Sequence, residues 1–322
     1  MWLIANQNLG NRDFPHERVF YSACLICYHT VIGQLSHQGG PEAAKKAEEL
    51  LERMQRMGHS VNLTTYNSVL NIWAKSRDHD AGTRAEKILE KMVEDEGVVP
   101  DIISFNTVLH AFSHRGQLYR AEALLERMLT DDTLPFPNTR SFSSVLTTLA
   151  RSGLSNAADR ATLILIRMQE LHDEEQLDCK PNTQCYNSAI NCLARSGDVD
   201  AGEHAERLAF NMQKLYEAGD PDIRPNIVTW NTVLNAHACS LHPDAVDRAR
   251  ALVQDLVSKS RNDPSLAPNE SSYNTLIKVI LLSKHPEKEQ LASSIRRLMR
   301  KKGWKPVQPK FPANFRNKRQ TT

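Results

Sequence analysis

An aromatic residue followed by a small polar residue recurs seven times along this chain. The aromatic residues are separated by 38, 39, 37, 44, 44 and 43 residues. The seven occurrences are Tyr28-His29, Tyr66-Asn67, Phe105-Asn106, Phe142-Ser143, Tyr186-Asn187, Trp230-Asn231 and Tyr273-Asn274. A period of this length predicts a repeat architecture, in which each unit is one supersecondary element that buries its apolar face against the next unit.

A stripe of alanine and methionine marks the second half of every unit. In each unit an alanine is followed seven residues later by methionine or, once, by leucine. The pairs are Ala47 and Met54, Ala85 and Met92, Ala121 and Met128, Ala161 and Met168, Ala205 and Met212, Ala249 and Leu256, and Ala292 and Met299. Seven residues make nearly two helical turns, so we expect both members on one buried helix face, where the alanine lets a neighbouring helix approach.

Helix boundaries are marked by proline followed by Asp or Asn shortly before the aromatic residue. Proline ends one helix, and the following side chain can accept hydrogen bonds from the free N–H groups of the next helix. The dipeptides are Pro100-Asp101, Pro137-Asn138, Pro181-Asn182, Pro225-Asn226 and Pro268-Asn269, with Val61-Asn62 as an imperfect version. Gly39, Gly116, Gly153 and Gly197 fall between the two predicted helices of a unit, where a left-handed residue closes the first helix.

Each unit therefore predicts a helix, a turn, a second helix and a stop. Such a hairpin cannot bury its apolar stripe alone, so the predicted fold class is all-α: an α-solenoid of about seven stacked helix-turn-helix repeats that form a superhelix. We assign residues 1–24 to an N-terminal segment, alone or as part of a degenerate repeat, residues 25–307 to the array and residues 308–322 to a disordered basic tail. The repeats are placed at 25–62, 63–101, 102–138, 139–182, 183–226, 227–269 and 270–307.

Composition and charge restrict the partners. Of the 322 residues, 40% are apolar, and no segment has the roughly 18 uninterrupted apolar residues of a membrane span, so we expect no membrane partner. The net charge is +2, but ten basic residues and no acidic residue follow Glu289, which leaves about −8 on residues 1–295. The basic end can contact phosphates or simply be a solvated terminus. The first twenty residues match neither a secretory signal nor a clean transit peptide.

Patterns for catalysis or metal binding are incomplete. His204-Ala205-Glu206 begins like the H-x-E motif of zinc deaminases, but no Pro-Cys-x-x-Cys follows it. Cys24 and Cys27 have the spacing of half a zinc site without a second pair, so we interpret them as helical core residues. The other cysteines are scattered, which favours small buried hydrophobic residues in a reducing compartment. No Gly-rich phosphate loop is present. We expect no catalytic site, metal, cofactor or small-molecule substrate.

Several segments together resemble the pentatricopeptide-repeat family. The clearest are PDIISFNTVLHAFSHRGQLYRAEALLERM, from Pro100, and PNIVTWNTVLNAHACS, from Pro225. They combine the proline and Asp or Asn start, the aromatic-Asn pair and the Ala to Met stripe in one order over residues 25–307, although these units exceed the usual 35 residues of the family. The resemblance implies binding of single-stranded RNA, one base per repeat.

The resemblance also implies which side chains recognise the bases. They are the residue after the aromatic and the last residue of the same repeat; amides and hydroxyls suit this role because both donate and accept hydrogen bonds. The pairs are His29 with Asn62, Asn67 with Asp101, Asn106 with Asn138, Ser143 with Asn182, Asn187 with Asn226, Asn231 with Asn269, and Asn274 with Val307. By the family's correspondence, Asn with Asp favours uracil, Asn with Asn a pyrimidine and Ser with Asn adenine. The implied core is U-Y-A-Y-Y, with no assignment for the first and last pairs.

Two further sets of residues complete the predicted RNA site. Eight residues after the first reading position stand Lys75, His114, Arg151 and Arg195, with His37, Cys239 and Leu282 in the remaining units. Lys75, Arg151 and Arg195 can hold phosphates, although cations also favour helix C-termini. The residues expected to flank the bases are Ile26, Thr64, Ile103, Arg140, Gln184, Val228 and Ser271.

The sequence thus predicts an RNA-binding protein without catalytic activity of its own, which acts in organellar RNA processing, stability or translation, with other RNA-processing proteins as further partners. A mitochondrion or plastid is implied by the resemblance alone. Two alternatives stay open: a protein-binding scaffold built on the same surface, and a non-catalytic subunit of a ribonucleoprotein. The recurring Asn after the aromatic favours RNA, because a peptide-binding groove has no reason to repeat one amide.

Overall fold

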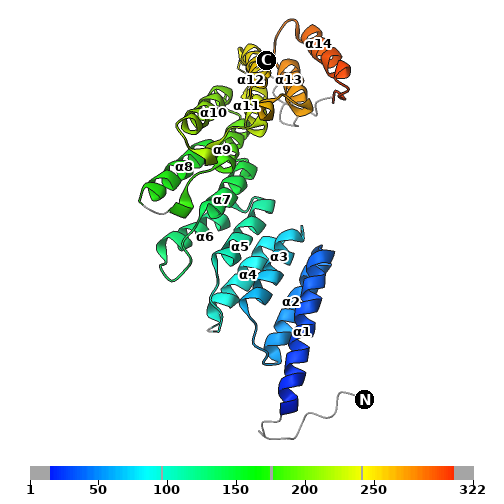
Figure 1. Ribbon diagram of the computed structural model, residues 1–322, viewed down its shortest axis with the longest axis vertical. Helices are drawn as coiled ribbons and strands as arrows, with labels where there is room; N and C mark the ends of the chain where they lie inside the picture. Colours follow the sequence, from blue (N-terminus) through cyan, green and yellow to red (C-terminus); the bar gives the residue numbers. More distant parts are fainter. Residues whose placement is uncertain (1–14, 96, 175–176, 241, 308–322) are drawn as a thin grey trace. The chain divides into compact units, whose positions relative to one another are not determined.

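The computed structural model describes residues 15–95, 97–174, 177–240 and 242–307 (Figure 1). This part of the chain contains fourteen α-helices, three short 3-10 helices and no strand. The α-helices are α1 (Pro15–Gln38), α2 (Pro41–Arg56), α3 (Leu63–Lys75), α4 (Ala81–Glu94), α5 (Ile102–Arg115), α6 (Leu118–Thr130), α7 (Thr139–Ser152), α8 (Ala157–Asp173), α9 (Thr183–Ser196), α10 (Ala201–Glu217), α11 (Ile227–Ser240), α12 (Ala245–Lys259), α13 (Glu270–Leu282) and α14 (Lys288–Lys301). The predicted all-α solenoid of helical hairpins is confirmed.

The chain divides into two compact units. The first holds α1 to α5, and the second holds α7 to α14; α6 is divided, with residues 118–126 in the second unit and 127–136 in the first. In both units the first helices of successive hairpins contact one another, as α3 contacts α5 and as α9 contacts both α7 and α11. The second helices α2, α4, α8, α10 and α12 each pack on their own first helix and on the next one, as α10 does on α9 and α11. The result in each unit is one layer of first helices and one of second helices.

The core of the hairpins is the predicted stripe. All seven alanines and all seven methionines or leucines of the stripe are buried, each at most 1% exposed. Five of the seven aromatic residues are also buried; Tyr28 and Tyr186 are half-buried. In the second unit one continuous cluster joins Trp230, Met212 and Ala249. Since burying a large apolar side chain contributes about 1.5–3 kcal/mol, this stripe is the main stabilising contact between neighbouring hairpins.

Two of the predicted glycine positions show why glycine is needed there. Gly153 and Gly197 end α7 and α9 with φ values of 71° and 74°, in the left-handed region that costs an L side chain strain. Both helices stop there, and the chain turns back into the second helix of the hairpin. Position 39 and position 116 also have positive φ, as the pattern predicted.

The long turns after α8, α10 and α12 are folded rather than open. Each contains a 3-10 helix: η1 (Leu177–Cys179), η2 (Pro221–Ile223) and η3 (Pro264–Leu266). A side chain of each 3-10 helix is buried at equivalent positions, namely Cys179, Ile223 and Leu266. Successive turns are joined by ion pairs at 2.8 Å, from Lys180 Nζ to Asp220 and from Arg224 to Asp263. The extra residues of these repeats therefore extend the contact between hairpins.

At the N-terminal end, α1 begins at Pro15, well before residue 25, where the repeat pattern places the first unit. Proline is favoured in the first turn of a helix because its missing N–H would have no partner there. Residues 1–14 and the basic tail 308–322 lie outside the described residues, as do the side chains of Cys24 and Ile26. Cys27 is exposed, so its interpretation as a core residue is wrong, whereas Cys179, Cys185 and Cys192 are buried as expected.

Candidate nucleic-acid interface

Every first helix from α3 to α13 begins at the predicted Asn or Asp, whose side-chain oxygen accepts backbone N–H groups. Asn62 accepts from Thr65 N at 2.9 Å, and Asp101 accepts from Ser104 N at the same distance. The same caps form at Asn138, Asn182, Asn226 and Asn269. These six residues are the second members of the predicted base-reading pairs. Their Oδ1 atoms accept hydrogen bonds from the first turn of the helix.

The first members of the pairs lie one residue after the buried aromatic residues, on the first helices. One residue is about 100° of helical rotation, so the side chain leaves the core beside its aromatic neighbour. Asn67, Asn187, Asn231 and Asn274 are half-buried. Asn106 and Ser143 are each only 5% exposed, so these two present less polar surface than the prediction requires.

The structure brings several predicted pairs into contact. Asn67 Nδ2 donates to Asp101 Oδ1 at 3.2 Å, and Asn231 Nδ2 donates to Asn269 Oδ1 at 3.4 Å. In the last repeat the backbone N–H of Val307 donates to Asn274 Oδ1 at 3.0 Å. Two positions more than thirty residues apart in sequence are therefore adjacent in space.

Among the described residues, no direct hydrogen bond joins the members of three other pairs: His29 with Asn62, Ser143 with Asn182, and Asn187 with Asn226. His29 and Asn62 are bridged by the Thr65 hydroxyl, 2.9 Å from His29 Nδ1 and 2.8 Å from Asn62 Oδ1. Asn187 and Asn226 line the same groove without bonding each other. Asn106 and Asn138 belong to different units.

A groove lies between α9 and α11, the first helices of two successive repeats. Its lining is uncharged and rich in amides and hydroxyls: Thr183, Gln184, Asn187, Ser188, Asn191, Asn226, Val228 and Thr232. Both members of the fifth predicted pair, Asn187 and Asn226, are among them. Neutral donors and acceptors beside one exposed apolar side chain, Val228, fit the edge and face of a nucleobase better than a charged ligand.

Three polar atoms at the first reading positions are buried without a hydrogen-bond partner. They are Ser143 Oγ, Asn187 Oδ1 and Asn231 Oδ1. An unsatisfied buried polar atom costs about 1–3 kcal/mol, so folded proteins keep few of them. The three atoms stand at equivalent positions of consecutive repeats.

Comparison with known proteins bears on the family of the repeats. Residues 18–137 match the family described as the pentacotripeptide-repeat region of PRORP, and residues 184–204 match the family described as PPR repeat. Two Arabidopsis thaliana pentatricopeptide repeat-containing proteins, one chloroplastic and one mitochondrial, are each 30% identical, over 135 and 138 residues. The chain belongs to the pentatricopeptide-repeat (PPR) family. The alignments cover 42% and 43% of this PPR protein, and the chain spans only 16% and 25% of the two relatives.

Two solved structures align with most of this chain at low similarity. The pentatricopeptide repeat protein PPR10 in complex with an 18-nucleotide psaJ RNA element aligns with 84% of this PPR protein and 39% of its own chain, with 20% identity and a TM-score of 0.45. A structure of PPR10 from maize aligns with the same share of this chain and 43% of its own, with 19% identity and a TM-score of 0.32.

The predicted phosphate-binding cations of this PPR protein lie at the ends of first helices. Lys75 ends α3, and Arg151 and Arg195 stand in the last turns of α7 and α9; all three are exposed. Arg195 Nη1 donates to the carbonyl oxygen of Ala150 at 2.9 Å, near the end of the preceding first helix. That bond satisfies a helix-end carbonyl, yet a guanidinium has five N–H groups and can still contact a phosphate.

A second polar row was missed in the sequence. Asn71, Asn191 and Asn235 stand four residues after Asn67, Asn187 and Asn231, one helical turn further along the same face, and each is half-buried. Asn191 lines the groove, and Asn235 accepts a hydrogen bond from Lys278 Nζ at 2.8 Å. The signal was present as Asn-x-x-x-Asn in YNSVLN, YNSAIN and WNTVLN.

The flanking positions are exposed where their side chains are described. Ile103 is 60% and Val228 57% exposed, on α5 and α11. Thr64, Arg140, Gln184 and Ser271 are also exposed. Exposed apolar side chains next to amides offer a surface for stacking against a base. The polar members of the set offer less apolar surface for stacking.

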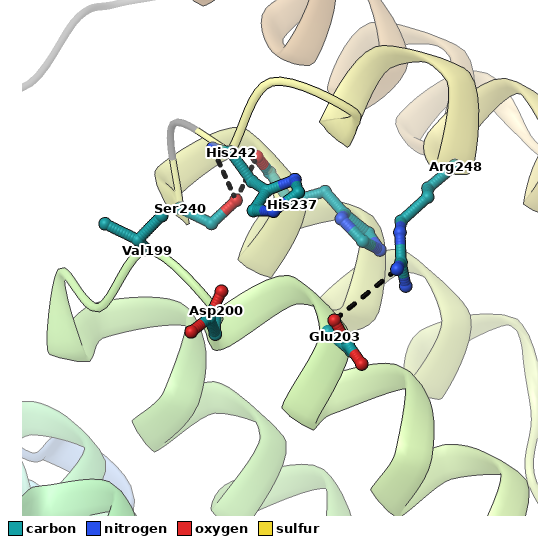
Figure 2. Close-up of a pocket in the computed structure, with 7 residues that line it drawn as sticks. All are labelled: Val199, Asp200, Glu203, His237, Ser240, His242 and Arg248. Atoms are coloured by element: carbon teal, nitrogen blue, oxygen red, sulfur yellow. Dashed lines mark hydrogen bonds and ion pairs between the residues drawn. The ribbon is translucent and has the colours of Figure 1, made fainter.

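The deaminase-like residues are part of a structural network instead. Glu206 accepts from His237 Nε2 at 2.9 Å and from Arg248 Nη1 at 3.3 Å. Arg248 also pairs with Glu203 at 3.4 Å (Figure 2). Burial raises the pKa of Glu206, but the hydrogen bond and charge of His237 and the charge of Arg248 outweigh it, so the pKa lies below its usual value. His204 lies 3.7 Å from Asp198. Among the described residues no group of three metal-ligating side chains occurs, and no described helix is long and apolar enough to span a membrane.

Proposed function

We propose that this PPR protein binds single-stranded RNA along the layer of first helices, with one base between each pair of successive repeats. The observation that carries the proposal is the uncharged groove between α9 and α11, lined by Asn187 and Asn226. Asn187 Oδ1 is buried there without a partner, and a base edge with a free amino or imino group would satisfy it.

The assignment of bases follows the pairs. Asn67 with Asp101 selects uracil, the Asn with Asn pairs select pyrimidines, and Ser143 with Asn182 selects adenine, which gives the core U-Y-A-Y-Y. Lys75, Arg151 and Arg195 contact phosphates beside the bases. The low exposure of Ser143 makes the third base of the core depend more on the partner residue, Asn182.

The biological role we propose is that of a non-catalytic RNA-binding factor in organellar RNA processing, stability or translation. Bound protein would block nucleases or hold a local RNA structure open, and would recruit other RNA-processing proteins. Relatives whose names place them in chloroplast and mitochondrion support an organelle. The amide that follows the aromatic residue in successive repeats favours RNA over a peptide. A groove that binds a peptide has no reason to repeat one amide every 37 to 44 residues.

The test is selection from a randomised RNA pool with purified protein, followed by sequencing of the bound fraction. We expect enrichment of U-Y-A-Y-Y. Replacing Asn67, Asn106, Asn187 and Asn231 together by alanine should weaken binding of the selected RNA at least about tenfold, since several hydrogen bonds of about 1 kcal/mol each are lost. The matched control replaces Asn211 and Asn262, which are exposed outside the first helices. Equal enrichment of all single-stranded sequences, with binding unchanged in the fourfold variant, would refute the proposal.

A further inference from the structure

The third residue of each first helix has the same role in five of six repeats. Thr65, Ser104, Ser141, Thr229 and Ser272 are at most 1% exposed, and each hydroxyl lies within hydrogen-bond distance of the Oδ1 atom of the helix-capping residue. The distances are 2.8 Å to Asn62, 2.9 Å to Asp101, 3.2 Å to Asn138, 3.5 Å to Asn226 and 3.1 Å to Asn269. The hydroxyl therefore holds the second member of a base-reading pair.

Two of these hydroxyls also reach the first member of the same pair, which lies on the preceding first helix. Ser104 Oγ donates to Asn67 Oδ1 at 2.7 Å, and Thr65 Oγ1 lies 2.9 Å from His29 Nδ1. With Asn67 Nδ2 directed at Asp101, the Ser104 hydroxyl determines which end of the Asn67 amide faces inward. A side chain fixed in this way discriminates between bases more strongly than one that samples several orientations.

The fifth repeat lacks this hydroxyl. Its third residue is Cys185, fully buried, and burial raises the pKa of the thiol to about 11, so the group is a neutral, weak hydrogen-bond donor. The cap, Asn182, is held by the backbone N–H groups of Gln184 at 3.0 Å and Cys185 at 3.1 Å. The first member of that pair, Ser143, is 5% exposed, and its Oγ has no hydrogen-bond partner.

We propose that the third residue of each first helix is a positioning residue for the base-reading pair of the preceding repeat, and that Cys185 leaves the Ser143 and Asn182 pair the least discriminating of the array. The inference rests on the proposed RNA binding. It assigns to the buried hydroxyls a part in specificity, beyond the two residues of each pair. By analogy with Ser104, a hydroxyl at position 185 would supply the missing partner for Ser143 and a further donor to Asn182.

The test compares dissociation constants for four RNAs that differ only in the base facing the fourth repeat. In Cys185→Ser the ratio between the worst and the best base should rise about fivefold, the effect of one net hydrogen bond, with the ratios at other positions unchanged. Ser104→Cys should lower the ratio for the base facing the second repeat by a similar factor. Cys192→Ser is the matched control, because Cys192 is equally buried in α9 but lies at no pair.

Circular dichroism shows whether each variant is folded, and either folded variant is enough for the test. Unchanged ratios in folded Cys185→Ser, or in folded Ser104→Cys, would overturn the positioning role. Discrimination between bases at the other repeats would show in the same experiment that the protein still recognises RNA sequence. A wild-type protein that discriminates at no position would instead overturn the proposed function and, with it, this inference.

Discussion

Asn67 and Asp101, at the two ends of the second repeat, meet through a hydrogen bond of 3.2 Å from Asn67 Nδ2 to Asp101 Oδ1. Asp101 simultaneously caps α5 by accepting from the backbone N–H of Ser104. The same carboxylate thus caps a helix and belongs to a pair that is predicted to recognise a base. The same dual use recurs at Asn269, which caps α13 and accepts from Asn231.

Replacing Asp101 by Asn separates these two roles. Asn and Asp are about equally good helix caps, so at neutral pH the thermal midpoint should change little. The base facing the second repeat should change from uracil alone to either pyrimidine, as measured by binding of RNAs varied at that base. An unchanged uracil preference would show that Asp101 takes no part in recognition.

The same variant should differ from wild type in its response to acid. Burial raises the pKa of Asp101, but hydrogen bonds from Ser104 and Asn67 outweigh it, so the folded pKa lies below the usual aspartate value. A depressed folded pKa contributes stability that is present above the unfolded pKa and is lost as pH falls through the folded pKa. Thermal midpoints measured below pH 4 should therefore fall less steeply in Asp101→Asn. Parallel curves would contradict this assignment.

The stripe between hairpins predicts a contrast between two methionines. Met212 is fully buried, so Met212→Ala should destabilise the second unit by about 2–5 kcal/mol through lost burial and a residual cavity. Met57 is 51% exposed at the end of α2, and Met57→Ala should change stability by less than about 0.5 kcal/mol. Chemical denaturation followed by circular dichroism measures both. Similar losses in the two variants would argue against the stripe as the core.

Two helical glycines predict opposite effects of the same substitution. A Cβ on Gly202 would overlap the ring of His237, with Cε1 at 2.7 Å, so Gly202→Ala should cost about 1–3 kcal/mol. Gly33, within α1, has no such neighbour within 4 Å, so Gly33→Ala should stabilise by up to about 1 kcal/mol. Thermal denaturation of the two variants compares them. If Gly202→Ala stabilised the protein, the His237 ring would have to move away from the new methyl group at little cost.

The sequence predicted the hairpins well because their signals repeat with helical periodicity. Aromatic, alanine and methionine positions face one core, and every Asn or Asp expected to begin a helix does so. The folded 3-10 turns were missed because Cys179, Ile223 and Leu266 stand in segments too short to show a period. The hydroxyls at the third position of the first helices were missed for a different reason. A Ser or Thr such as Ser104 or Thr229 is compatible with many helix starts, and its contact with another repeat is seen only in the three-dimensional structure.

The cations predict a sequence-independent effect on RNA affinity. Replacing Lys75, Arg151 or Arg195 singly by Ala should weaken binding of all RNAs alike and reduce the slope of log affinity against log salt by about one per contact. Lys214, exposed on the second helix α10, is the control. Arg195→Ala also removes the bond to the Ala150 carbonyl, so its stability is measured in parallel. A salt slope equal to that of wild type in all three variants would exclude phosphate contacts at these positions.

Recoding a single repeat tests the central claim most directly. Asn187→Ser converts the fifth repeat from an Asn with Asn pair to a Ser with Asn pair, and the smaller side chain fits the groove between α9 and α11 without crowding. Selection from a randomised RNA pool should then change the enriched core from U-Y-A-Y-Y to U-Y-A-A-Y, with the other four bases as in wild type. An unchanged core, or a loss of preference spread over all positions, would contradict the reading of one base by each repeat.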